Sequence, residues 1–552
     1  MRRLLYAFLG YSLLIGSCAI PRPPTGGPPD RTPPRLVSSD PPAGAIHVQT
    51  RRIRLTFSEY IDPASFQQAL SIHPEPDMPP RIRWKGKTVE LIFDRPLREQ
   101  TTYLITLDTH LKDWHGVPLQ TPITLAFSTG AYLYEARLRG QVRFGWSDAP
   151  APAFDVFAYR DIPASLQEAL PDYRTQTDPR GNFELAYLPD TTFFVIALND
   201  QNRNRRPDPT EAFAVPPRAL LPALRTPTTR DLWYVTRLDT LPPALRIIRP
   251  LSNQRLELRF SEPVQLLSLQ PKGWTLRTRK GKEILLQALF QPQAPSPVLY
   301  VLTEPMPTDS LQLVPTAIAD TAGNTLPPVQ RTFFPTEIPD TFRTRFLQFL
   351  PSNPVARESA TLVLSPYSRP GIRFSQPPDT SRFAATLHVR DTSGTAISYR
   401  YETRDGRSFY LILSSREAPF ELQLDGRLIG EDTLFTQRYR YLTSDEVGNL
   451  ILPVRYTGTE PLRVTLLALD RGRLPTPLTQ SLTSEGAVTF TRLPEGHYRM
   501  KVFLDRLPDG RWNGGTIVPY QPPERLIWLP DTLRVRPRWD IVLDTLELNQ
   551  NP

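Results

Sequence analysis

Proline constrains this chain more than any other residue, because 63 prolines are spread through its 552 residues against only 27 glycines. Proline lacks the amide hydrogen that a helix interior or a central strand requires, so it is confined to short strands, sheet edges and rigid connections. No long stretch keeps a helical period of apolar residues without a proline interrupting it. The sequence therefore predicts an all-β fold. A single hydrophobic core stops growing at about 250–300 residues, so we expect roughly three to five domains.

The charged residues are mixed along the chain rather than gathered in blocks. The formal net charge is +9, and arginine supplies most of the positive charge. A basic balance permits contact with anionic lipid, anionic glycan or nucleic acid. No basic run is interleaved with aromatic residues, the pattern that is typical of a nucleic-acid-binding face. We therefore expect a mixed-charge surface and no nucleic-acid partner.

The first residues have the parts of an export signal. Residues 1–3 carry two arginines, residues 4–15 are apolar, and the small residues 16–17 precede Cys18. The apolar run is shorter than the roughly 20 residues that a transmembrane helix needs. Cys18 is the only cysteine, which excludes disulfides within the chain and cysteine-based metal clusters.

The segment Ile15–Cys18 resembles the lipobox read by lipoprotein signal peptidase. The resemblance implies a signal peptide over residues 1–17 and lipid chains on Cys18 that anchor the protein to the outer membrane. The alternative is an ordinary secretory signal with an incidental cysteine. Residues 18–34 are rich in proline and glycine and predict an extended tether. In Bacteroidota-type lipoproteins an acidic cluster after the cysteine marks export to the cell surface. Residues 19–22 lack one, which favours the periplasmic face.

Two stretches far apart in the chain repeat one pattern. Residues 53–59 (IRLTFSE) and 256–262 (LELRFSE) alternate apolar and polar side chains, which predicts strands with one buried face. Further along, each is followed by an Asp-x-x-Gly-x-x-Leu motif, which suits a tight turn. A third motif, with Ile in place of Leu, is expected to close a further region. The motif residues are Asp113, Gly116 and Leu119; Asp320, Gly323 and Leu326; and Asp445, Gly448 and Ile451.

These motifs resemble the F-S-E strand and the D-x-x-G-x-x-L turn of the bacterial Ig-like domain that is common in Bacteroidota lipoproteins. The resemblance implies Ig-like β-sandwiches over residues 35–130 and 238–340. A degenerate third copy is expected over residues 341–452, where the opening strand is reduced to Arg373–Ser375. A sandwich of this type implies no chemistry of its own.

A second type of repeat alternates with the first. A glycine is followed by a Leu-Pro pair over residues 181–189 (GNFELAYLP) and again, at the same spacing, over residues 486–494 (GAVTFTRLP). This pattern resembles the prealbumin-like or carboxypeptidase-regulatory-like β-sandwich, and it implies such domains over residues 131–237 and 453–552. The five domains would then follow one another as a string, and the short proline-rich joints predict a stiff rod.

A loop rich in Asp and Asn follows the first Leu-Pro pair. Oxygen-bearing side chains occupy its positions one, three, five, nine and twelve, the ligand register of an EF-hand-type calcium loop, and position seven would add a carbonyl. Position six is Arg205 instead of glycine, and the neighbouring arginines bring positive charge near the proposed cation. The alternative is a turn whose side chains bond their own backbone. The proposed ligands are Asp200, Asn202, Asn204, Asp208 and Glu211, with the carbonyl of Arg206.

The second prealbumin-like copy carries a weaker version of this loop. It has Gly510 at position six, but Leu507 and Thr516 replace two ligands. Nearby Trp512 and Tyr520 are either core residues or a platform for a glycan. The remaining calcium ligands would be Asp505, Asp509 and Asn513, with the carbonyl of Arg511.

No sequence motif of a known catalytic chemistry occurs, and we expect a protein that is not an enzyme and needs no cofactor beyond the calcium considered above. Glu59 and Glu262 end equivalent strands, which favours a role in the fold over catalysis. His110 and His115 lie next to Asp113, where a transition-metal site is the alternative to exposed loop histidines.

Three functions fit these features to different degrees. The first is a lipid-anchored scaffold, spacer or binding module for an envelope protein or glycan. The alternative is a cell-surface adhesin or glycan-capture protein that uses the tips of its sandwiches. A remote third is an enzyme with an unrecognised site, which would require a deep pocket with converging titratable groups.

Overall fold

Five β-sandwiches account for most of the residues that the structure describes. In this computed structural model those residues are 30–165, 169–227 and 231–548. Strands dominate, and they form pairs of sheets along the chain, which confirms the expected all-β, multidomain fold. We name the sandwiches domain 1 (residues 30–130), domain 2 (131–237), domain 3 (238–340), domain 4 (341–446) and domain 5 (447–548).

The predicted membrane attachment lies before domain 1. The predicted signal peptide, Cys18 and all but the end of the predicted tether precede residue 30 and are outside the described residues. Over the part that the structure describes, no helix combines the length and the apolar character needed to span a membrane.

Domain 1 packs a four-stranded sheet, in the order β1-β2-β5-β4, against a three-stranded sheet, β3-β6-β7. The strand predicted over residues 53–59 forms β2, and its apolar side chains Ile53, Leu55 and Phe57 are buried in the core between the sheets. Its elements are β1 (Leu36–Asp40), β2 (Arg52–Phe57), α2 (Pro63–Ala69), β3 (Leu70–His73), β4 (Arg81–Lys85), β5 (Thr88–Ile92), β6 (Thr102–Leu107) and β7 (Ile123–Ser128).

Domain 3 repeats this strand order as β16-β17-β20-β19 and β18-β21-β23, with β22 beside β17. Both predicted Asp-x-x-Gly turns form, and Gly116 and Gly323 have φ values of +85° and +102°, a region that favours glycine. Its strands are β16 (Leu245–Ser252), β17 (Arg255–Leu266), β18 (Thr275–Thr278), β19 (Leu286–Phe290), β20 (Ser296–Thr303), β21 (Leu311–Val314), β22 (Ile318–Asp320) and β23 (Arg331–Phe333).

The first sheet of domain 4 has the same strand order as in domains 1 and 3, and its second sheet has two additional strands. The degenerate opening strand lies in β27, which takes the place of β2 in the order β24-β27-β30-β29, and β25 and β26 extend the second sheet. Its elements are β24 (Phe346–Leu350), β25 (Ala356–Glu358), β26 (Thr361–Leu364), β27 (Gly371–Phe374), η1 (Thr380–Arg382), α3 (Phe383–Thr386), β28 (Leu387–Asp391), β29 (Tyr399–Glu402), β30 (Ser408–Leu413), β31 (Phe420–Asp425), η2 (Gly426–Leu428) and β32 (Leu434–Tyr441).

Domains 2 and 5 share a different order. The first strand of each, β8 or β33, lies between an antiparallel strand (β11 or β36) and parallel strands from the end of the domain (β15, or β40 and β41). The second sheets also correspond, as β10-β9-β12 and β35-β34-β37. The shared order agrees with the repeat seen in the sequence.

The strands of domain 2 are β8 (Ala136–Phe144), β9 (Asp155–Tyr159), β10 (Tyr173–Gln176), β11 (Asn182–Leu188), β12 (Thr192–Leu198), β13 (Phe213–Ala214), β14 (Leu220–Pro222) and β15 (Asp231–Val235). Those of domain 5 are β33 (Val447–Tyr456), β34 (Leu462–Ala468), β35 (Leu478–Leu482), β36 (Gly486–Pro494), β37 (Gly496–Leu504), β38 (Leu526–Trp528), β39 (Leu533–Val535), β40 (Asp540–Val542) and β41 (Leu546–Leu548).

The third Asp-x-x-Gly turn was wrongly predicted. Asp445 lies in a short 3-10 helix, η3 (Ser444–Glu446), and Gly448 lies within β33, which pairs with β36. A Cβ atom on Gly448 would lie 2.2 Å from the carbonyl oxygen of Arg536, so glycine is needed there for a close backbone approach. The domain boundary expected after residue 452 therefore falls before Val447.

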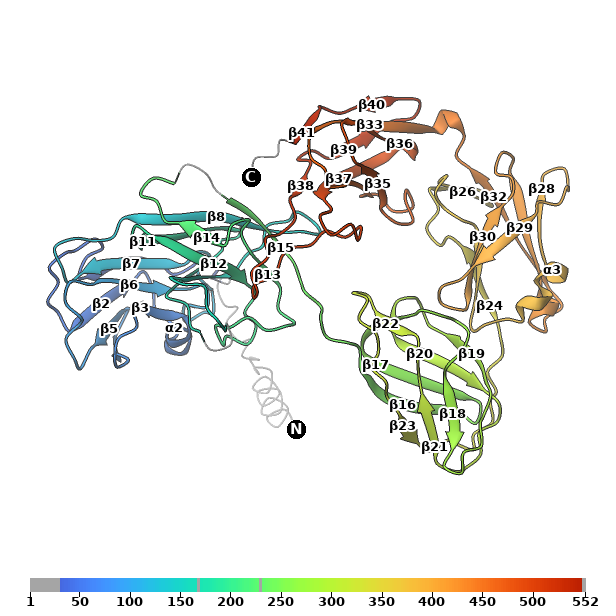
Figure 1. Ribbon diagram of the computed structural model, residues 1–552, viewed down its shortest axis with the longest axis horizontal. Helices are drawn as coiled ribbons and strands as arrows, with labels where there is room; N and C mark the ends of the chain where they lie inside the picture. The colour runs from blue at the N-terminus through green and yellow to red at the C-terminus, as the bar shows by residue number, and fades with distance from the viewer. Residues whose placement is uncertain (1–29, 166–168, 228–230, 549–552) are drawn as a thin grey trace, which may run out of the picture.

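The domains do not form the predicted rod. Figure 1 shows the chain running from domain 2 through domains 3 and 4 and returning, so that domain 5 lies against domain 2. Domains 3 and 4 meet where the N–H of Gln291 donates to the carbonyl of Asp405, at 2.9 Å. Domains 4 and 5 meet where Arg473 donates to the carbonyl of Val355, at 3.0 Å. Domains 2–5 thus form a closed ring, and domain 1 is attached to domain 2.

Candidate functional site at the closure of the ring

The first candidate calcium loop, between β12 and β13, closes through its own hydrogen bonds. Asp200 accepts the backbone N–H groups of Asn204, at 3.1 Å, and Arg205, at 2.8 Å. The side-chain amides of Asn202 and Asn204 both donate to Asp208, at 2.5 and 3.0 Å. Arg205 takes the left-handed φ of +61° that glycine would supply in a calcium loop. The oxygens proposed as ligands therefore face hydrogen-bond donors of the protein.

Glu211 fastens the two ends of this loop together. It is 4% exposed, and its carboxylate accepts the N–H of Gln201 at 2.9 Å and that of Asp208 at 3.2 Å. Burial raises the pKa of Glu211 above its ordinary value. The N–H of Arg206 donates to Asn204 at 2.7 Å. Within the described residues, the loop's carboxylates do not converge on a shared point. The arrangement matches the turn alternative, and calcium here stays a prediction.

The second loop, between β37 and β38, is built on the same plan. Asp505 is fully buried and accepts the N–H of Gly510 at 3.0 Å, as Asp200 accepts that of Arg205. Asp505 also pairs with Arg463, at 2.8 Å. The Arg463 guanidinium and the Gly510 N–H thus both contact Oδ2 of Asp505, one of the oxygens proposed as calcium ligands. The other proposed ligands of this loop include Asp509, which accepts the N–H of Arg511 at 2.8 Å.

Glu524 is the functional residue that the sequence analysis missed. Its carboxylate accepts the N–H groups of Arg506, at 2.7 Å, and Asn513, at 2.8 Å. Glu524 thus joins the two ends of the loop in domain 5, as Glu211 does in domain 2. It is 4% exposed, and burial raises its pKa. An inserted segment, residues 514–523, separates it from the rest of the loop. The shared signal in the sequence is a Pro-x-Glu triplet, which ends at Glu211 in one copy and at Glu524 in the other.

The inserted segment packs domain 5 against domain 2. Ile517 joins a buried cluster that includes Phe157 and Phe194 of domain 2. The ring of Tyr520 meets that of Phe194 edge-on, with centroids 6.2 Å apart, and its hydroxyl donates to the carbonyl of Pro216 at 2.7 Å. Tyr520 is therefore part of an interface between domains.

Trp512 extends this contact along the edge of domain 2. Its ring meets Tyr234 edge-on at 6.3 Å, within a cluster that also contains Trp528. Its indole N–H donates to the carbonyl of Glu524 at 2.9 Å. A Cβ atom on Gly145 would lie 2.5 Å from the Trp512 ring, so glycine makes room for it. Aromatic rings in such a seam supply much of the binding energy of an interface.

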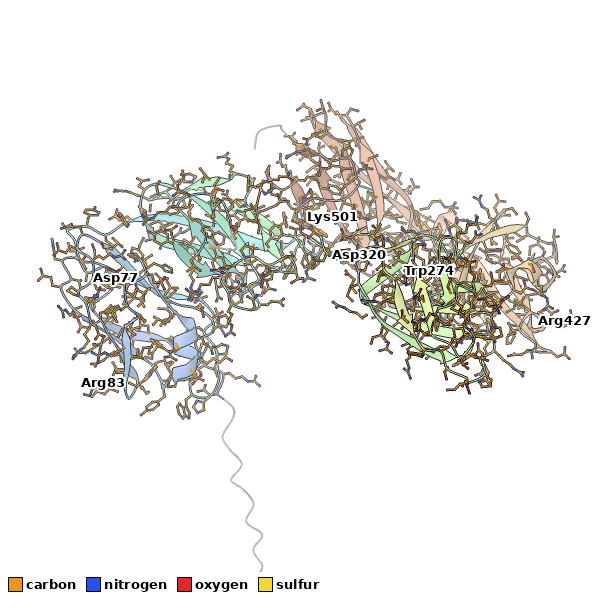
Figure 2. All side chains as sticks on the ribbon, turned by 60° about the horizontal axis from the view of Figure 1, so that its bottom comes forward. Asp77, Arg83, Trp274, Asp320, Arg427 and Lys501 are labelled. Carbon is orange, nitrogen blue, oxygen red and sulfur yellow. The ribbon has the colours of Figure 1, made fainter. Side chains whose placement is uncertain are left out.

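Charged groups complete the closure. Asp148 of domain 2 is 9% exposed and pairs with Arg143 of its own domain, at 2.8 Å, and with Arg499 of domain 5, at 2.9 Å. The Arg499 guanidinium also lies over the Trp528 ring, 4.7 Å from its centroid. Lys501 (Figure 2) lies on the same strand, and burial lowers the pKa of its ammonium group.

A cleft of about 970 Å³ opens beside this seam, between domains 2 and 5. Five arginines and three acidic residues are among its described lining, with Trp233 and Trp512. Two of these arginines share the carboxylate of Glu184, at 2.7 and 2.9 Å. The walls thus combine apolar surface with guanidinium groups, an arrangement that suits an elongated acidic or polar ligand. The arginines are Arg137, Arg139, Arg218, Arg506 and Arg525.

Comparison with known proteins identifies one domain type. A family model described as a bacterial Ig-like domain matches residues 30–129. The Ig-like character predicted for domain 1 is confirmed. No curated protein matches the chain at a significant level.

A search of solved structures gives matches of low identity and low TM-score. The N-terminal part of the bacterial S-layer protein SbsC is 10% identical over 37% of this chain and 45% of that chain, with a TM-score of 0.17. Alpha-2-macroglobulin of E. coli is 10% identical over 91% of this chain and 34% of that chain, with a TM-score of 0.14. BcpA, the major pilin subunit of Bacillus cereus, is 10% identical over 50% and 94%, with a TM-score of 0.15. The chain spans less than half of the first two, and scores this low carry no functional argument.

Proposed function

We propose that this protein is a non-enzymatic envelope lipoprotein, anchored through Cys18 to the outer membrane, whose ring of β-sandwiches is a scaffold for one binding cleft. The closure of domain 5 onto domain 2 carries this proposal. Neighbouring domains of one chain move relative to one another unless a large apolar interface joins them. The aromatic contacts of Trp512 supply such a joint, and the partly buried Asp148–Arg499 ion pair adds to it.

The cleft beside the closure is the proposed binding site. Its arginine and tryptophan side chains suit an acidic segment of another envelope component, a protein or a glycan. The lipid anchor would hold the ring at the membrane, on the periplasmic face, with the cleft available to that component. No nucleic acid is expected as a partner.

Photo-crosslinking in cells tests the cleft. A crosslinking residue at Leu232, a cleft residue that is 43% exposed, should capture a defined envelope component. The matched control is Tyr401 of domain 4, which is 39% exposed and outside the cleft. Capture at both positions alike, or at neither, would contradict the cleft as the binding site.

The anchor is tested separately. Cys18→Ser should move the protein from the membrane fraction to the soluble fraction. Protease added to intact cells should leave the parent protein whole until the outer membrane is permeabilised. Digestion in intact cells would instead support the alternative of a cell-surface adhesin or glycan-capture protein. The exposed side chains of Trp114, Trp146 and Trp539, which are 70, 51 and 58% accessible, favour that alternative as sugar-stacking surfaces.

A further inference from the structure

Three carboxylates converge on one point at the edge of domain 1. Asp30 precedes the first strand, Glu59 follows β2, and Asp113 lies in the closing turn. One ligand atom from each of them, and one from His115, all lie within 4.8 Å of one another. The sequence analysis considered Glu59 and the histidine separately, and the fold brings them together.

Asp113 has a buried oxygen without a hydrogen-bond donor. The residue is 1% exposed, and its Oδ1 atom accepts the N–H of Val117 at 2.8 Å. Its Oδ2 atom is buried and has no hydrogen-bond partner. A buried carboxylate oxygen that is neither solvated nor paired is strongly unfavourable, so it calls for a hydrogen-bond donor or a cation.

Domain 3 contains the same cluster in a satisfied form. Asp239, Glu262 and Asp320 each place a ligand atom within 4.8 Å of the others. Here the side-chain amide of Asn324 donates to Oδ2 of Asp320, at 2.8 Å, and also to the carbonyl of Asp239, at 2.8 Å. Asp320 lies at the edge of domain 3 (Figure 2).

The two clusters differ at one matched position. Asn324 lies four residues after Asp320, as Val117 lies four residues after Asp113, and both donate a backbone N–H to the aspartate, at 2.9 and 2.8 Å. Valine has no amide to donate to the second oxygen. Domain 1 has His115 in this turn, where domain 3 has Ala322. Domain 1 thus lacks a donor that domain 3 has, and it has a metal ligand that domain 3 lacks.

We propose that Asp30, Glu59, Asp113 and His115 bind a divalent transition-metal ion, Mn²⁺ or Zn²⁺, at the edge of domain 1. The ion supplies the positive partner for Asp113 that the Asn324 amide replaces in domain 3. Mn²⁺ and Zn²⁺ accept carboxylate and imidazole ligands together, whereas Ca²⁺ takes oxygen ligands. The ion would tie the segment that enters domain 1 to its closing turn.

Calorimetric titration of the full mature chain with Mn²⁺ or Zn²⁺ alone tests the proposal. We expect one site that is weakened about tenfold or more in Glu59→Gln and in Val117→Asn, because the new amide takes the place of the ion. Glu262→Gln, the matched change in domain 3, should leave the affinity unchanged. The reciprocal variant Asn324→Val should add a second, weaker site.

Two results would overturn the proposal. One is a parent chain that binds neither Mn²⁺ nor Zn²⁺ at millimolar concentration. The other is a site whose affinity is the same in Glu59→Gln and Val117→Asn as in the parent. Thermal unfolding of each metal-free variant shows whether domain 1 is still folded, and Val117→Asn keeps every proposed ligand, so its loss of binding cannot come from a missing side chain.

Discussion

The Asp200 loop of domain 2 and the Asp505 loop of domain 5 occupy equivalent places between matching strands, yet they serve different purposes. In both, an aspartate accepts the N–H five residues on, at 2.8 Å in one and 3.0 Å in the other. In both, a buried glutamate fastens the ends. The first loop contacts domain 1, where Arg203 donates to Gln68 at 2.8 Å. The second has grown by an inserted segment that closes the ring.

The difference shows how a turn becomes an interface. Both loops have corresponding hydrogen bonds from backbone N–H groups to the aspartate and the glutamate. In domain 5 the inserted segment lies between the ninth loop position and the glutamate that closes the loop. Ile517 and Tyr520 of the inserted segment pack on apolar side chains of β9, β12 and β13 in domain 2. The carboxylates also differ: Asp505 is neutralised by Arg463, whereas the charge of Asp200 acts on Asp155 within domain 2.

The largest expected effect is a change in the stability of domain 2 with pH. Burial, and further the charges of Asp108 and Asp200, raise the pKa of Asp155 to about 7. Because the folded state holds this proton more tightly than the unfolded state, stability should fall as pH rises from about 4 through about 7, by about 4 kcal/mol. Asp155→Asn should flatten this fall in unfolding curves of domain 2. An unchanged pH slope in the variant would contradict the assignment.

Next in size is the aromatic seam of domain 5. Trp512→Ala should weaken the closure by about 3 kcal/mol, since a large side chain is removed from a packed contact. Hydrogen exchange should then increase in the domain 2 peptide that contains Tyr234. Trp539→Ala is the control, because Trp539 is 58% exposed and lies away from the closure. Equal exchange in the two variants would show that Trp512 does not hold the domains together.

Removing Glu211 or Glu524, the glutamates that close the two loops, should have different effects on the contact between domains 2 and 5. Glu211→Ala and Glu524→Ala each leave buried N–H groups without an acceptor, and each should cost about 2 kcal/mol locally. Only Glu524→Ala should release domain 5 from domain 2, as a cross-linker between the domains would detect. If Glu211→Ala opened the ring as well, the loops would not have the separate roles described here.

The smallest effect is expected from calcium. A site of the affinity seen in extracellular modules, with Kd of about 10⁻⁴–10⁻³ M, would raise the stability of domain 2 by about 0.4–1.4 kcal/mol at about 1 mM Ca²⁺. Asp200→Asn should abolish that gain, and Asp505→Asn should not change it. No calcium-dependent shift in the melting temperature of the parent would settle the Asp200 loop as a turn.

Local patterns in the sequence predicted much of the fold. The alternation over residues 53–59 and 256–262 marked β2 and β17, because the alternating apolar side chains of each strand are buried in its domain core. Two of the three Asp-x-x-Gly motifs are turns. The third motif is not a turn, because Gly448 lies in β33 and makes room for a close backbone contact. The sequence alone does not distinguish a glycine that makes room for a neighbour from one that adopts a positive φ.

Less of the candidate site could be predicted from local sequence patterns. Glu524 lies beyond the inserted segment, so a fixed spacing pointed to Thr516 instead. The closure depends on residues far apart in the chain, such as Tyr520 and Pro216. Nothing in the local pattern around either one shows that they meet, and the short joints favoured a rod. Shape complementarity between domains appears only when both surfaces are built.

Small-angle X-ray scattering of the mature chain in solution tests the central claim, the closure of domain 5 onto domain 2, most directly. The account predicts a scattering curve and a maximum dimension that match the closed ring, and an increase in that dimension in Trp512→Ala. A parent chain with the long maximum dimension of five sandwiches in a row, unchanged by Trp512→Ala, would contradict it.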